Sequence, residues 1–198
     1  MNNLFPHIYD KLMAPLEKGK LKSIRKDLLE HARGKVLEIG AGTGVNFPLY
    51  RHAEKVIALE PNPKMIKLAA SNMQNAKVPI ETCQQKAEML PFQDCAFDTV
   101  TATLVFCTIP PEKAFQEIYR VLKPGGRLLM LEHIRMQQPM LARLQDFLTP
   151  AWKKVCDGCC LNRQTLNLLK GQNLFHLLLT KYYFKGLFAV TIAEKRGL

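Results

Sequence analysis

The sequence predicts an α/β fold, a doubly wound and mostly parallel sheet that ends in an antiparallel hairpin at one edge. Apolar runs of strand length alternate with stretches of helical period, as they do when helices cover both faces of a parallel sheet. A glycine-rich turn, residues 40–44, directly follows the first of these runs. The last two β-rich runs are separated only by Lys185 and Gly186, which is too short for a parallel crossover and indicates a hairpin. Together these features predict a Rossmann-like fold.

The elements follow in a regular order. The residues before the first strand carry apolar side chains at helical spacing, Leu21, Ile24, Leu28 and Leu29, so we expect one or two amphipathic helices there. The Lys-Pro-Gly-Gly sequence at 123–126 ends the last internal helix. We expect parallel strands over residues 35–40, 55–60, 79–83, 97–104 and 126–133, helices over 47–52, 63–74 and 111–122, and the hairpin over 175–184 and 186–195.

A chain of 198 residues, 47% apolar and 23% charged, is expected to form one globular domain. Within it we distinguish an N-terminal helical lid (1–34), a cofactor-binding core (35–134), and a substrate-side segment with the C-terminal hairpin (135–198). The N-terminus lacks a secretory signal pattern, and no apolar run approaches the roughly 18 residues of a membrane span. We therefore expect a cytoplasmic protein with free cysteine thiols.

The net charge of +11 lies outside the predicted core. Residues 1–35 carry +4, residues 36–132 are neutral, and residues 133–198 carry +7. An anionic membrane surface would attract such flanks, and a solvated basic face is the alternative. The N-terminal share of this charge includes Lys18, Lys20, Lys22, Arg25 and Lys26.

The glycines in the stretch VLEIGAGTG indicate a ligand-binding turn. Three glycines, Gly40, Gly42 and Gly44, let the backbone approach a ligand closely after the first strand. A dinucleotide fingerprint would need glycine at Val45, and the phosphate-binding Gly-Lys-Ser/Thr ending is absent. Glu60 ends the second strand, where a carboxylate can accept hydrogen bonds from both ribose hydroxyls. The pattern therefore predicts a nucleoside ligand without a diphosphate.

Four ordered motifs carry a family resemblance. VLEIGAGTG, ALEPNPKMIKLA, AEMLPFQDCAFDTV and VLKPGGRLLMLEH, between residues 36 and 133, resemble the motifs of class I S-adenosylmethionine-dependent methyltransferases, particularly the UbiE-type branch. The resemblance implies an enzyme that binds S-adenosylmethionine and releases S-adenosylhomocysteine. It implies cofactor contacts from Glu38, Gly40, Gly42, Thr43 and Gly44 (methionine part), Glu60 (ribose), Pro61, Met65, Ala87 and Glu88 (adenine), and Thr103 and Leu104 (sulfonium).

Two further features bear on the resemblance. Where relatives usually carry an acidic residue before the alanine of the third motif, this chain has Lys86, so Glu88 or the backbone is expected to read the adenine. The segment WKKVCDGCCLNRQT, residues 152–165, is similar to one in thiol methyltransferase-like proteins, a branch associated with lipid membranes. It favours a small, soft or lipid-like acceptor over nucleic acid.

His133 is the candidate general base, because it ends a strand at the edge where such folds bind ligands. A hydrogen-bonded structural histidine is the alternative. Tyr9, in the segment that folds over the cofactor in relatives, and Asp157 are candidate substrate contacts.

The cysteines Cys156, Cys159 and Cys160 admit three interpretations. A packed thiol cluster is preferred, and redox regulation and a metal site are the others. No metal is expected, because a structural zinc site needs four ligands and the sequence has no second cysteine pair of this kind.

The predicted function is S-adenosylmethionine-dependent methylation of a small-molecule or lipid-like acceptor, a thiol, a quinol or phenol, or an amine. An RNA methyltransferase is the alternative suggested by the basic flanks, although they show no RNA-binding module or interleaved aromatic residues.

Overall fold

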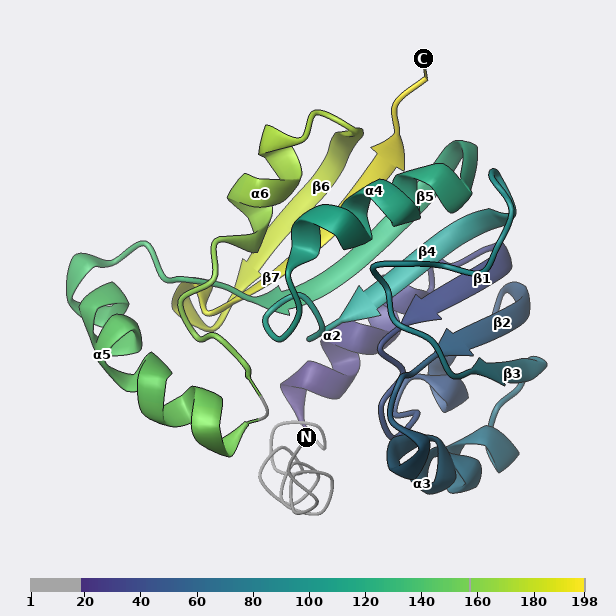
Figure 1. Ribbon diagram of the computed structural model, residues 1–198, viewed down its shortest axis with the longest axis horizontal. Coiled ribbons are helices and arrows are strands. Elements are labelled where there is room, and N and C mark those ends of the chain that lie inside the picture. The colour runs from purple at the N-terminus through teal and green to yellow at the C-terminus, as the bar shows by residue number, and fades with distance from the viewer. Residues whose placement is uncertain (1–18, 157, 198) are drawn as a thin grey trace.

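The computed structural model describes residues 19–156 and 158–197, which form a seven-stranded sheet with helices on both faces (Figure 1). The strand order is β3-β2-β1-β4-β5-β7-β6. Pairing is parallel from β3 to β5 and antiparallel where β7 pairs with β5 and β6, which confirms the mostly parallel sheet and its C-terminal hairpin. The strands are β1 (Gly34–Ile39), β2 (Ala53–Leu59), β3 (Ile80–Cys83), β4 (Phe97–Thr103), β5 (Leu122–His133), β6 (Phe175–Tyr183) and β7 (Phe188–Lys195).

Five α-helices connect and flank these strands in the part of the chain that is described. The 3-10 turns η1 (Phe47–Leu49) and η2 (Phe184–Gly186) are short. None of the helices in the described ranges combines the length and apolar character that crossing a membrane would require. The helices are α2 (Lys20–Leu29), α3 (Pro63–Gln74), α4 (Pro111–Val121), α5 (Pro139–Val155) and α6 (Thr165–Gly171).

Alternation along the strands divides the core into two layers. Leu37 of β1 belongs to the cluster that contains Phe115 of α4 and Leu166 of α6, and Val36 belongs to the cluster that contains Leu21 and Leu28 of α2. Successive strand residues point to opposite faces, so β1, β5 and β7 contribute buried residues to both clusters. Helix α2 is thus part of the core, and the rest of the predicted lid, residues 1–18, lies outside the described residues.

The predicted helix over 47–52 is corrected to the single turn η1. Tyr50 leaves the helix with extended backbone angles and is completely buried. Its hydroxyl lies 3.0 Å from a carboxylate oxygen of Glu38 and 2.7 Å from Oγ1 of Thr101. These buried polar contacts explain why the chain turns inward instead of continuing the helix, because a buried hydroxyl needs hydrogen-bond partners.

The segment between His133 and the hairpin contains the two helices that the sequence pattern did not predict, α5 and α6. Helix α6 joins α4 over one face of the sheet, whereas α5 projects from its side (Figure 1). The buried residues of α5 are small or polar, Ala142, Gln145 and Thr149. Its large apolar residues recur at helical spacing but are exposed, so this helix does not bury its apolar face as a core helix does.

Candidate active site

The glycine-rich turn lies at the carboxyl end of β1 and has an unusual backbone. Gly40, Gly42 and Gly44 all have positive φ angles, of 65°, 55° and 75°. A Cβ atom on Gly40 would lie 2.6 Å from Val105, and one on Gly44 would lie 2.6 Å from Phe47, so packing demands glycine at both. A Cβ on Gly42 would meet nothing within 4 Å. The middle glycine therefore faces open space, where a ligand can approach the backbone.

Glu60 joins this turn to the end of β2. Its carboxylate accepts a hydrogen bond from the backbone N–H of Gly42 at 3.0 Å and another from Asn62 at 2.9 Å. Burial raises the pKa of Glu60, and these two hydrogen bonds offset part of that increase. A carboxylate held in this way beside an open glycine is an acceptor for sugar hydroxyls.

A buried polar network supports the turn from below. Both carboxylate oxygens of Glu38 are occupied, by the amide of Asn46 at 2.7 Å and the hydroxyl of Tyr50 at 3.0 Å. Burial raises the pKa of Glu38 to about 7, although these hydrogen bonds and the charge of Arg25 lower it in part. Glu38 is 1% exposed. The structure therefore places it beneath the turn, where it positions the backbone.

Thr103, at the end of β4, belongs to the same network. Its hydroxyl accepts from the Asn46 amide at 2.9 Å and from the guanidinium of Arg25. Arg25 is 2% exposed, so it does not face a lipid surface and its charge is used internally. The next residue, Leu104, has a positive φ of 59°, and its N–H donates to the carbonyl of Leu131 at 2.7 Å.

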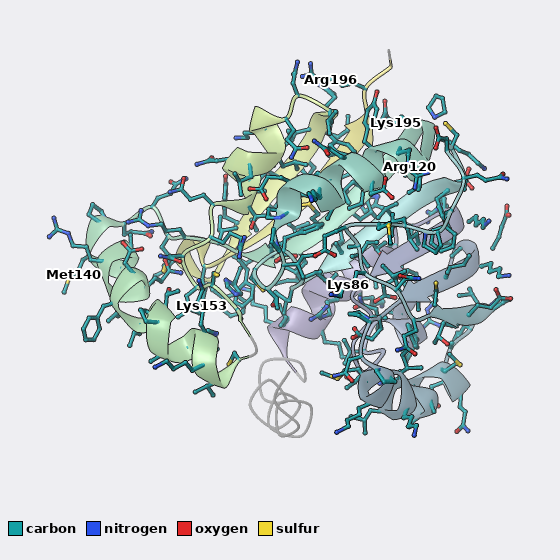
Figure 2. The ribbon with its side chains drawn as sticks, viewed as in Figure 1. Lys86, Arg120, Met140, Lys153, Lys195 and Arg196 are labelled. Carbon is teal, nitrogen blue, oxygen red and sulfur yellow. The ribbon has the colours of Figure 1, made fainter. Side chains whose placement is uncertain are left out.

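A cavity of about 300 Å³ opens beside the end of β2. Pro61 and Glu88 line it, whereas Ala87 and Met65 are buried and pack beneath the surface. Lys86, labelled in Figure 2, also contributes to the wall, with Gln84, Gln85 and Met89. The open glycine, the Glu60 carboxylate and this cavity fit the amino-acid, ribose and base parts of a nucleoside such as S-adenosylmethionine.

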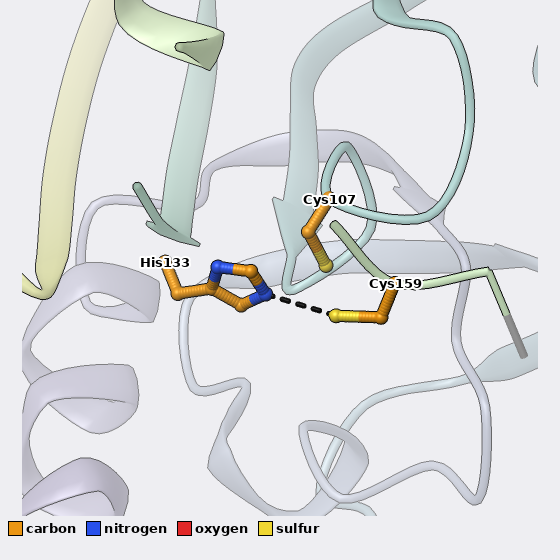
Figure 3. A group of neighbouring side chains, drawn as sticks. All are labelled: Cys107, His133 and Cys159. Carbon is orange, nitrogen blue, oxygen red and sulfur yellow. Dashed lines mark hydrogen bonds between the residues drawn. The ribbon is translucent and has the colours of Figure 1, made fainter. Parts of the chain in front are cut away.

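A second group of reactive side chains lies at the carboxyl ends of β4 and β5 (Figure 3). The Sγ atoms of Cys107 and Cys159 and a ring nitrogen of His133 lie within 4.8 Å of one another. Nε2 of His133 is 3.0 Å from Sγ of Cys159. In Figure 3 the sulfur of Cys107 points toward the other two residues. We call these three residues the cysteine–histidine cluster.

Backbone hydrogen bonds bring the three segments of this cluster together. One carboxylate oxygen of Glu132 accepts from the N–H groups of Val105 at 2.8 Å and Phe106 at 3.0 Å, which ties the end of β5 to the loop of Cys107. The N–H of Cys160 donates to the carbonyl of Cys107 at 2.8 Å, which places Cys159 beside that loop. The cluster is therefore held by the fold.

The pKa values of Cys159 and His133 are shifted by their neighbours in the cluster. The Cys107 thiol, as a hydrogen-bond donor, and the neighbouring His133 hold the pKa of Cys159 well below its usual value. Burial alone would lower the pKa of His133, but its interactions with Cys159 and Glu132 outweigh burial and raise it. The cluster thus favours a thiolate beside a protonated imidazole.

The structure brings most of the predicted site residues to one edge of the sheet. Tyr9 and Asp157 lie outside the described residues. Thr43 is buried in the glycine turn. Sequence reasoning missed Asn46, Arg25 and Cys107. Only Cys107 carried a usable signal, because it closely follows a predicted strand and so belongs at the ligand-binding edge.

The chain is similar to known methyltransferases over most of its length. Residues 37–130 match the family described as "Methyltransferase domain". The thiol S-methyltransferase TMT1B of Homo sapiens is 36% identical over 174 residues, which cover 81% of this chain and 71% of that protein. The ubiquinone/menaquinone biosynthesis C-methyltransferase UbiE of Bartonella bacilliformis is 35% identical over 119 residues, 57% of this chain and 46% of that protein.

A solved structure shares the whole fold. It is a SAM-dependent methyltransferase of Thermotoga maritima, described as a possible histamine N-methyltransferase. It matches with a TM-score of 0.69 at 22% identity, over 99% of this chain and 100% of that one.

Proposed function

Because the chain belongs to the class I S-adenosylmethionine-dependent methyltransferases, we propose that it methylates a small thiol bound at the cysteine–histidine cluster. The chain is a methyltransferase and its methyl donor is S-adenosylmethionine. The acceptor is the part that is proposed. It is supported by the soft, ionisable side chains that surround the ends of β4 and β5.

The residues of the first two strands would hold the donor. Glu60 would accept from its ribose hydroxyls, and the open backbone at Gly42 would admit its methionine part. Pro61 and Glu88 would border the adenine in the cavity that they line. Glu38 would act through the turn, because its oxygens are already occupied by Asn46 and Tyr50.

The position of the cluster carries the proposal. His133 ends β5 and Cys107 lies in the loop after β4. Thr103, the last residue of β4, and Leu104, the next one, are the residues expected beside the sulfonium. A sulfonium supplies an already activated methyl group, so the protein must chiefly align the acceptor and remove its proton. Protonated His133, whose positive charge Cys159 and Glu132 favour, would stabilise the thiolate that remains once this proton has left to solvent. Such surroundings suit a thiol, which reacts as its thiolate.

The similar proteins bear on the choice of acceptor. The relatives named above are described as a thiol methyltransferase and a quinone methyltransferase. They support a small or lipid-like acceptor and give no support to the RNA alternative.

An acceptor screen tests the proposal. S-Adenosylhomocysteine release is followed with matched thiols, phenols, quinols and amines, and we expect turnover with thiols. His133→Asn should lower kcat for the thiol while leaving S-adenosylmethionine affinity unchanged. Turnover of a phenol or an amine, with no turnover of any thiol, would overturn the assignment.

We also propose that α5 rests on an anionic lipid surface. Its exposed apolar residues share helical spacing, and two of them, Met140 and Phe147, are 84% and 80% exposed. Met140 lies at the outer end of the helix (Figure 2). Exposed cations accompany this apolar face, and residues 133–198 carry +7. An apolar face with cations beside it matches a helix that inserts shallowly into an anionic interface. The apolar residues are Met140, Leu144, Phe147, Leu148 and Val155, and the cations are Arg143, Lys153 and Lys154.

Vesicle sedimentation tests this surface. We expect salt-sensitive binding to phosphatidylserine-containing vesicles and little binding to neutral ones, since each lipid-facing cation contributes about 1 kcal/mol. The double variant Met140→Ser/Phe147→Ser should reduce binding, whereas Leu178→Ser, an exposed apolar residue on β6, should not. Equal binding by the double variant and the parent chain would rule out α5 as the contact.

A further inference from the structure

We propose that Cys107, His133 and Cys159 form a three-ligand site for Zn²⁺, with the fourth coordination position binding the acceptor thiol. This inference rests on the proposed thiol methylation, and it adds how the acceptor is held and ionised.

The distances within the cluster are close to those that zinc requires. Zn–S bonds of about 2.3 Å and Zn–N bonds of about 2.0–2.1 Å place tetrahedral ligand atoms roughly 3.5–3.8 Å apart. In the structure all three ligand atoms lie within 4.8 Å of one another, and Nε2 of His133 is 3.0 Å from Sγ of Cys159. Adjustments of about 1 Å or less would therefore complete the geometry.

The donor set is one that zinc prefers. Two thiols and an imidazole are ligands of a borderline-soft cation, and a Cys₂His set with an open fourth position is a known catalytic arrangement. Both cysteines are free of disulfides. The sequence predicts no metal because Cys156, Cys159 and Cys160 lack a partner pair. The fold supplies the missing ligands from the ends of β4 and β5.

The surroundings of the cluster favour a cation. Cys107 is 2% exposed and His133 is 8% exposed, so a bound ion would be shielded from water. The second carboxylate oxygen of Glu132 is buried and has no hydrogen-bond partner among the described residues. The first oxygen fixes the Cys107 loop through two backbone N–H groups. The charge of Glu132 favours positive charge at the neighbouring His133, whereas Arg163 opposes it.

A bound zinc ion would change the chemistry of the acceptor in a balanced way. The acceptor thiol loses its proton to solvent when its sulfur occupies the fourth position. Its electron pair then forms the new sulfur–carbon bond while the bond between the methyl carbon and the donor sulfonium breaks. The products are a neutral methyl thioether and S-adenosylhomocysteine, and the metal returns unchanged. The ion supplies the positive charge that a protonated His133 would otherwise carry.

Metal binding is measured directly, without reference to methylation. The full chain is purified under reducing conditions without added metal, and its zinc content is determined by mass spectrometry. The protein is then freed of metal with a chelator. It is titrated with Zn²⁺ in competition with a chromophoric chelator and, separately, with Co²⁺. We expect about one zinc ion per chain and thiolate-to-Co²⁺ charge-transfer absorption, which reports cysteine ligation.

Isosteric variants decide whether this cluster is the site. Cys107→Ser and Cys159→Ser should weaken Zn²⁺ binding at least about 100-fold and abolish the charge-transfer band. Cys95→Ser, at an exposed cysteine outside the cluster, should bind as the parent does. Circular dichroism and S-adenosylmethionine affinity confirm that each variant is folded. Absence of zinc binding in the parent, or its survival in both cluster variants, would overturn the metal site. Thiol turnover by zinc-free protein would overturn the role of the ion in holding the acceptor, while leaving the proposed function intact.

Discussion

The clearest test of the cofactor-binding turn is Gly42→Ala, because a side chain at this position would meet a bound ligand but no core residue. A Cβ on Gly40 or Gly44 would collide with Val105 or Phe47, so alanine there would disturb the core. A Cβ on Gly42 would point into open space. If S-adenosylmethionine occupies that space, the added methyl group should interfere with binding without colliding with the core.

The expected magnitudes follow from the backbone and from packing. Gly42 has a φ of 55°, and a left-handed conformation costs a residue with a Cβ about 1–2 kcal/mol, so Gly42→Ala should lose about that much stability. An extra methyl group in a close-packed contact costs about 1–3 kcal/mol. S-Adenosylmethionine affinity should therefore fall roughly 5- to 150-fold.

Gly125→Ala is the matched control. Gly125 has a φ of 71°, its Cβ would also meet nothing within 4 Å, and it lies in the Lys-Pro-Gly-Gly turn of β5, away from the candidate site. Urea unfolding and calorimetry should show similar stability losses for the two variants, with weakened cofactor binding only for Gly42→Ala. Unchanged S-adenosylmethionine affinity in folded Gly42→Ala would refute the placement of the donor over this turn.

Two further predictions concern the carboxylates on either side of the turn. Glu60→Ala should weaken the binding of S-adenosylmethionine and S-adenosylhomocysteine, measured by calorimetry, by about 1.5–3 kcal/mol for each lost hydrogen bond to the ribose. Glu54→Ala, at an exposed residue on β2, is the control and should leave both affinities unchanged. Equal affinities in Glu60→Ala and the parent chain would exclude the ribose role. Burial raises the pKa of Glu38 to about 7, although its neighbours Arg25 and Tyr50 lower it in part, so the stabilising effect of the protonated carboxyl is full below pH 4.5 and is lost as the pH rises through 7. Glu38→Gln should remove a decline of up to about 3 kcal/mol between pH 5 and pH 8 in urea-unfolding free energy, and an unchanged pH slope would contradict the buried ionisation.

The cofactor half of the molecule could be predicted from the sequence because its signals are local. Strand runs, the glycine spacing and Glu60 each reflect the conformation or chemistry of a short segment. The sheet order and the hairpin confirm the predicted strands, and Glu60 lies beside the glycine turn. The helix over 47–52 was wrong in extent, since the burial of the Tyr50 hydroxyl against Glu38 and Thr101 outweighs local helical preference.

By itself, therefore, the sequence determined the fold class and a nucleoside ligand, because contiguous residues encode the strand, turn and carboxylate that a nucleoside requires. The methyl donor followed from the resemblance of its four motifs to those of class I methyltransferases. Only the tertiary structure decided that Cys107, His133 and Cys159 meet. Their contact depends on Glu132 binding the loop after β4 and on Cys160 donating to the carbonyl of Cys107. The exposure of the apolar face of α5 was likewise decided there, since the helix buries Ala142, Gln145 and Thr149 instead. Which side of a helix is covered, and which distant loops converge, depends on packing between elements rather than on spacing within one.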